Sequence, residues 1–98
     1  METKSERRSG EPEPEKVYAA ITLRRAQVLC GLADARSERE IADALCLTLA
    51  GVRSHVEDLK GITGQQSVRE LSRWWQAHRM AWLAFYAREG GVAELQIQ

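Results

Sequence analysis

The chain has 98 residues, of which 14 are basic and 14 are acidic, so its formal net charge is zero. This length suits one domain with a modest core. No apolar run approaches the roughly 20 residues that a membrane span needs, and residues 1–10 lack the apolar core of a signal peptide. The sequence therefore predicts a cytoplasmic protein without membrane contact.

The two cysteines, Cys30 and Cys46, form no CxxC pair and show no repeated spacing. We interpret them as buried thiols in a reducing compartment, because neither a disulfide framework nor a zinc site has this pattern. The alternative is a metal site that also recruits His55 or His78. The sequence also contains no Gly-rich phosphate loop and no catalytic set of Ser, Cys or His. We therefore expect no enzymatic activity, no cofactor, no metal and no small-molecule substrate.

Residues 1–16 combine low hydrophobicity with Gly10, Pro12 and Pro14, which predicts a disordered leader. Specific contacts made by this tail are the alternative, although it holds no docking motif. Residues 17–88 are rich in Ala, Leu, Arg and Glu and contain no proline. This composition predicts an all-α domain.

Helix caps mark the first two predicted helices. The first begins after Thr22, whose hydroxyl can cap free N–H groups, and ends near Asp34. The second begins after Ser37, because Ser37 and Glu40 have the spacing of a capping box.

A third helix follows a tight connection at residues 46–47 and is capped by Thr48. Its buried face is predicted to consist of Val52, Val56 and Leu59. A fourth helix starts at a second capping box, formed by Ser67 and Glu70, and continues to Arg88. The last seven residues either form a short strand or fray.

A series of residues between 21 and 71 follows the pattern of a known family. They are Ile21-Thr22-Leu23-Arg24, Val28-Leu29, Ser37, Glu40-Ile41-Ala42, Leu45, Leu47-Thr48, Val52, His55, Leu59, Gly64, Ser67 and Glu70-Leu71. In this order and without a gap, they resemble the DNA-binding domain of the LuxR/GerE family. Region 4 of sigma factors shares much of this pattern, but His55 and Gly64 favour the LuxR type.

The resemblance implies a four-helix LuxR/GerE-type helix-turn-helix domain that binds double-stranded DNA and regulates transcription. Residues 17–66 form its helix-turn-helix core, and residues 67–98 add a long fourth helix and a C-terminal tail to the same domain. The resemblance also implies that Arg53, Ser54 and Glu57 face the major groove and read bases.

Positive charge on the domain supports this function. Residues 21–88 carry ten Lys or Arg against seven acids, a net charge of +3. The candidates for phosphate contacts are Arg24, Thr48, Lys60 and Arg69. The alternative for each of these charged residues is an ordinary solvated helix face. We interpret His55 as structural, held between helices.

Several departures from the family pattern weaken the DNA-binding hypothesis. Gly51 stands where the family usually has Thr, Ile62 where it has Lys, and Arg25 where it has Glu. Glu57 and Asp58 add two carboxylates near the proposed DNA face, where they repel phosphates. Weak binding per monomer is therefore expected. The alternative is a degenerate helix-turn-helix that binds a transcription factor or an RNA polymerase subunit.

The fourth predicted helix carries an aromatic stripe that suggests an interface. Its members are Trp75, His78, Trp82, Phe85 and Tyr86. Three short helices cannot easily cover a stripe of about 33 Å, so the sequence predicts a homodimer or a protein partner there. The alternative is that these aromatic residues fold back over residues 17–21 and complete the core of the monomer.

Overall fold

Five helices follow one another between residues 14 and 91, the range that the computed structural model describes, and this range contains no strand. They are α1 (Pro14–Ala20), α2 (Leu23–Ala33), α3 (Glu38–Leu45), α4 (Leu49–Thr63) and α5 (Val68–Arg88). The all-α prediction is therefore confirmed. Within these residues no helix is both long and apolar enough to cross a membrane.

The predicted N-terminal caps of α2, α3 and α4 are all present. Thr22, Ser37 and Thr48 each have extended backbone, and each side chain accepts a hydrogen bond from the backbone N–H three residues later. At α3 the capping box is complete, because the Glu40 carboxylate also accepts a bond of 2.8 Å from the Ser37 N–H. These bonds satisfy N–H groups that have no partner inside the helix.

The start of α5 differs in one detail from the prediction. The Ser67 hydroxyl accepts from the Glu70 N–H at 3.1 Å, as expected. The Glu70 carboxylate, however, accepts from the N–H of Gln66 at 2.8 Å and not from that of Ser67. The helix ends at Arg88, as predicted, and Gly90 follows it with a φ of 89°.

Helix α1 was not predicted. It begins at Pro14, so the prediction of a disordered leader is wrong for residues 14–16, while residues 1–13 lie outside the described range. Proline is tolerated at the first position of a helix, because the N–H that it lacks has no partner there. Val17 packs this helix against the rest of the chain, and only 6% of the Val17 surface is exposed. The described chain therefore has five helices where the sequence predicted four.

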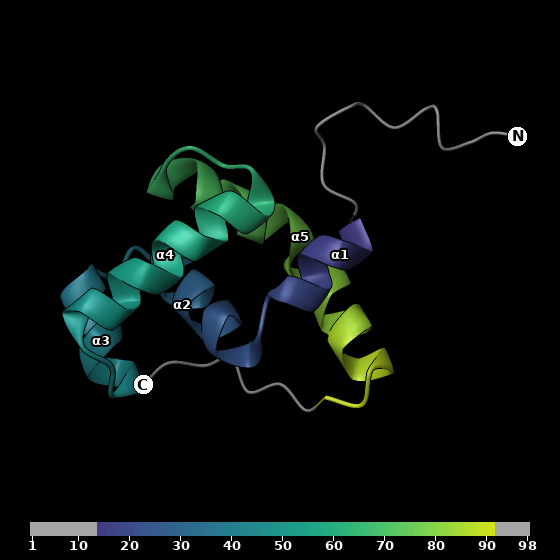
Figure 1. Ribbon diagram of the computed structural model, residues 1–98, viewed down its shortest axis with the longest axis horizontal. Coiled ribbons are helices and arrows are strands. Elements are labelled where there is room, and N and C mark those ends of the chain that lie inside the picture. The colour runs from purple at the N-terminus through teal and green to yellow at the C-terminus, as the bar shows by residue number, and fades with distance from the viewer. Residues whose placement is uncertain (1–13, 92–98) are drawn as a thin grey trace, which may run out of the picture.

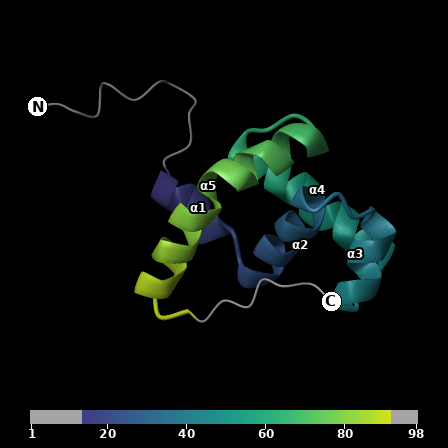
Figure 2. The same cartoon turned by 180° about the vertical axis from the view of Figure 1, so that it is seen from behind.

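Helix α2 lies in the middle of the fold and contacts α3, α4 and α5, whereas α1 packs against α5 (Figure 1). The view from behind shows α3 and α4 side by side at the opposite end from α1 (Figure 2). One apolar core joins all five helices. Its largest fully buried side chains are Trp75, Trp82, Ile21, Leu29, Ile41, Leu59 and Leu71.

The structure corrects part of the predicted interface. Trp75 and Trp82 have no exposed surface and belong to the core of the single chain. The physical reason is that α5 packs against α2, α4 and α1 within the same chain. The Trp82 indole reaches the Ile21 carbonyl after α1, and the Trp75 ring lies 5.7 Å from that of Trp82. For Trp82 the alternative, folding back over residues 17–21, agrees with the structure, because its indole donates to the Ile21 carbonyl. His78, Phe85 and Tyr86 are partly exposed, and their role at an interface stays a prediction.

Candidate nucleic-acid interface

Helices α3 and α4 are joined by the three residues 46–48. Cys46 ends α3 in the left-handed conformation, with a φ of 57°. The Leu47 N–H donates to the Ala42 carbonyl at 2.9 Å, and the Cys46 N–H donates to that of Asp43 at 3.4 Å. These two bonds form a Schellman motif, which ends a helix with a sharp change of direction. Thr48 then starts α4 at once.

The two faces of α4 differ sharply. Val52, Val56 and Leu59 are buried, as predicted. Arg53, Ser54 and Glu57 are all exposed. The structure therefore brings the three candidate base-reading residues together on the solvent side of one helix, and their contact with DNA stays a prediction.

Carboxylates accompany the cations on and around α4. The ion pairs are Arg53 with Glu38 (3.0 Å), Lys60 with Glu57 (3.2 Å) and Arg25 with Asp58 (2.9 Å). The side chain of Arg53 is 63% exposed within its pair. Exposed pairs of this kind contribute about 0–1 kcal/mol, so a phosphate or a base can replace the carboxylate at little cost.

The four candidate phosphate contacts lie on three helices or their caps. Thr48 and Lys60 belong to the cap and the last turn of α4. The Arg24 guanidinium of α2 donates to the Leu45 carbonyl at 3.3 Å, which places it beside the connection between α3 and α4. Arg69 is exposed in the first turn of α5, and no hydrogen bond or ion pair joins it to the other three candidates in the described structure.

Sequence reasoning did not find the roles of Glu38 and Arg25. Glu38 stands 15 residues before Arg53 and meets it only because α3 packs beside α4. Arg25 donates to the Ala20 carbonyl at 2.9 Å and pairs with Asp58, so it connects the end of α1 to α4. The pair also offsets the Asp58 charge, which the sequence analysis counted as repelling DNA. No local pattern reveals either contact.

The cysteines and His55 bear on the alternative of a metal site. Cys30 is buried and Cys46 is exposed, so the prediction of two buried thiols is wrong for Cys46. Between residues 14 and 91 no group of three or more metal-binding side chains comes together. His55 is half-buried in α4, and its buried Nδ1 atom has no hydrogen-bond partner among the described residues.

Comparison of the chain with protein families, with curated proteins and with solved structures found no match. The functional hypothesis therefore depends on the residues described above and on the resemblance stated for residues 21–71.

Proposed function

We propose that this protein binds double-stranded DNA and regulates transcription, with α3 and α4 as its helix-turn-helix. The observation that carries the proposal is the arrangement of Arg53, Ser54 and Glu57. They are exposed on one face of α4, while the opposite face is held in the core. A helix fixed in this way can lay its polar face into a major groove.

The exposed residues have the chemistry that base reading requires. The Arg53 guanidinium can donate two hydrogen bonds to O6 and N7 of a guanine, and the Glu57 carboxylate can accept from the amino group of a cytosine. To do so, each side chain must leave its present partner, Glu38 or Lys60. The exchange is inexpensive because the side chains of Arg53 and Glu57 are largely exposed.

A modest charge limits the affinity of a single copy. A net charge of +3 over residues 21–88 supports few phosphate contacts. Binding as a homodimer would double them, and two recognition helices would then read two half-sites. We therefore include a homodimer in the proposal.

A titration of the full chain against labelled DNA at several salt concentrations tests this function. Affinity should fall steeply as salt rises, because bound phosphates release counterions. On a site selected from random sequences, Arg53→Ala should cost about 1–3 kcal/mol, with little loss on unselected DNA. Arg88→Ala, at the far end of α5, is the matched control. Binding that is absent at low salt would refute the proposal, and equal losses on both DNAs would assign Arg53 to a phosphate.

A second candidate function is binding to a transcription factor or a polymerase subunit. It is favoured by three carboxylates that form ion pairs with the cations on and around α4. These are the carboxylates of Glu38, Glu57 and Asp58. A surface of balanced charge suits a protein partner better than a polyanion. The salt titration separates the two functions. If the chain binds DNA, its affinity for DNA falls steeply as salt rises, and no other protein is needed. If it binds a protein partner, the purified chain shows no such binding to DNA.

A further inference from the structure

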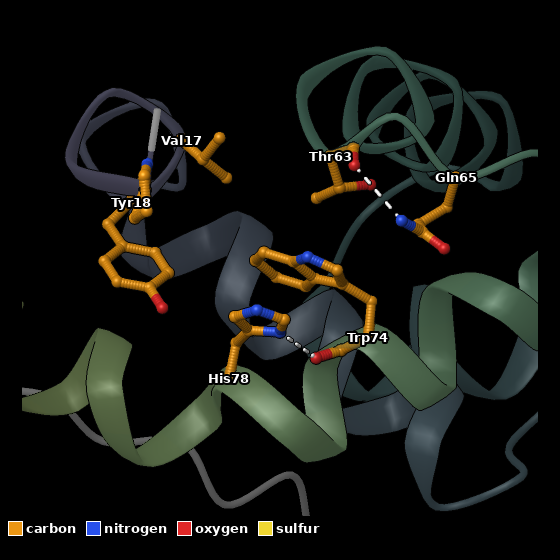
Figure 3. A pocket seen from close by; sticks show the side chains of 7 residues that line it. Val17, Tyr18, Thr63, Gln65, Trp74 and His78 are labelled. Carbon is orange, nitrogen blue, oxygen red and sulfur yellow. Dashed lines mark hydrogen bonds between the residues drawn. The ribbon is translucent and has the colours of Figure 1, made fainter. Parts of the chain in front are cut away.

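A cavity of about 360 Å³ lies where α1, the end of α4 and α5 meet. Val17 and Tyr18 stand on one side of it, Thr63 and Gln65 stand on the other, and Trp74 and His78 rise from α5 between them (Figure 3). Pro14 completes the lining. Small-molecule sites begin at about 300 Å³, so the cavity can hold a small ligand.

Three rings form the aromatic side of this cavity. The indole of Trp74 stacks on the imidazole of His78, with centroids 4.2 Å apart and planes 14° from parallel. Tyr18 stands edge-on to both rings, 6.4 Å from Trp74 and 6.3 Å from His78. Because His78 covers one face of the indole, the other face is turned toward the gap between α1 and the end of α4 (Figure 3).

Hydrogen bonds within the protein occupy several donors of the lining. The Thr63 hydroxyl donates to the Leu59 carbonyl at 2.8 Å, and the Gln65 amide donates to the Thr63 carbonyl at 3.2 Å. A carbonyl only accepts, so the contact of 2.8 Å between His78 Nδ1 and the Trp74 carbonyl places a hydrogen on Nδ1. These bonds leave lone pairs on the Thr63 oxygen and on the Gln65 amide oxygen.

The lining is therefore rich in electrons and contains no Lys, Arg, Asp or Glu among its described residues. The Tyr18 phenol is uncharged at neutral pH, and burial raises its pKa further. An anion finds no Lys or Arg among the described residues of this lining. A positive charge, in contrast, is attracted to the face of an indole and to lone pairs.

We propose that this cavity binds a small organic cation, an alkylated ammonium whose methyl or methylene groups lie against Trp74 and Tyr18. The attraction has two parts: apolar contact with Val17 and the rings, and the electrostatic attraction of the charge to the indole face. This site goes beyond DNA binding and does not rest on it.

Tetramethylammonium chloride is the probe, titrated into the full chain while the indole N–H signals are followed by NMR. The Trp74 signal should shift and saturate. The fully buried Trp75 and Trp82 serve as internal references and should move much less. Tert-butanol has similar size and shape but no charge, and should bind at least tenfold more weakly. Sodium chloride at equal concentration corrects for ionic strength.

Two substitutions of equal charge locate the site. Gln65→Lys places a cation at the cavity and should weaken binding of the probe at least tenfold. Gln66→Lys, at an exposed neighbour, should leave it within twofold. An unsaturated Trp74 shift, equal binding of tert-butanol, or equal effects of the two substitutions would each overturn the proposal. Circular dichroism of both variants checks that they remain folded.

Discussion

The indole Nε1 of Trp82 donates a hydrogen bond of 3.1 Å to the backbone carbonyl of Ile21, which stands 61 residues earlier in the chain. Both residues are buried, and the bond joins the C-terminal half of α5 to the segment between α1 and α2. A second ring, that of Tyr86, stacks on Trp82 with centroids 4.7 Å apart. The N-terminal segment therefore completes the core around α5 within one chain.

Trp82→Ala should destabilise the protein by about 3–5 kcal/mol, because it opens a cavity and leaves the Ile21 carbonyl without its donor. Urea unfolding followed by circular dichroism measures this loss. Met80→Ala, on the same helix but 74% exposed, should change the stability by less than about 1 kcal/mol. If the two variants were equally stable, Trp82 would not belong to the core.

Ala35→Gly should stabilise the protein. Ala35 has a φ of 64°, and the Arg36 N–H behind it donates to the Gly31 carbonyl at 3.0 Å, so Ala35 occupies the left-handed position of a Schellman motif. Glycine removes the steric cost of Cβ there, and the net gain after its larger entropy loss is about 0.5–1 kcal/mol. Thermal unfolding measures the gain. Ala77→Gly in the middle of α5 should instead cost about 1 kcal/mol, and a loss in both variants would contradict the argument.

The sequence predicted those parts of the fold that depend on neighbours in the chain. Thr22, Ser37 and Thr48 mark the starts of three helices because a cap needs only the next three residues. Helix α1 was not predicted because it is short and begins at a proline, and its stability depends on packing against the distant α5. The left-handed conformation of Ala35 was not predicted, because an alanine in the sequence does not indicate a positive φ.

For the candidate site, too, the sequence predicted the features that depend on a single helix and missed those that depend on packing between helices. The exposed position of Arg53 follows from the periodicity of α4, so the sequence was sufficient to place it on the polar face. Its partner Glu38 belongs to another helix, so the pair cannot be predicted without knowing how α3 packs against α4. The cavity beside Trp74 was missed for a related reason, since α1 supplies one of its walls.

The two cysteines should react with a thiol reagent at very different rates. Burial raises the pKa of the Cys30 thiol above its ordinary value. A raised pKa lowers the fraction of reactive thiolate at any given pH, and burial also hinders access. Cys46 is exposed and should react first. Mass spectrometry of the native chain should show one fast addition, which Cys46→Ser abolishes and Cys30→Ser leaves intact; fast labelling of Cys30 would contradict its burial.

Glu38→Gln should strengthen DNA binding by releasing Arg53 from its ion pair. The substitution removes the carboxylate that lies 3.0 Å from the Arg53 Nε atom and also removes one negative charge beside α4. We expect a gain of about 0.5–1 kcal/mol, the size of an exposed ion pair, in a fluorescence anisotropy titration. Asp43→Asn makes the same change of charge at an exposed position of the same helix. An equal gain in both variants would mean that net charge acts, and not the freedom of Arg53.

Glu57→Lys should strengthen binding to DNA of random sequence, and the size of the gain depends on whether α4 meets the phosphates. The substitution replaces an exposed carboxylate on the proposed DNA face by an ammonium group, and it also frees Lys60 from its pair of 3.2 Å. Each new phosphate contact should steepen the dependence of log affinity on log salt by about 0.9. Glu89→Lys makes the same change of charge at the exposed C-terminal cap of α5, far along the fold from α4. If α4 enters the groove, Glu57→Lys should raise affinity several-fold and steepen the salt dependence, while Glu89→Lys changes both much less. Equal effects of the two substitutions would show that only the total charge matters, and a Glu57→Lys variant that binds no better than the unmodified chain would place α4 away from DNA and favour a protein partner.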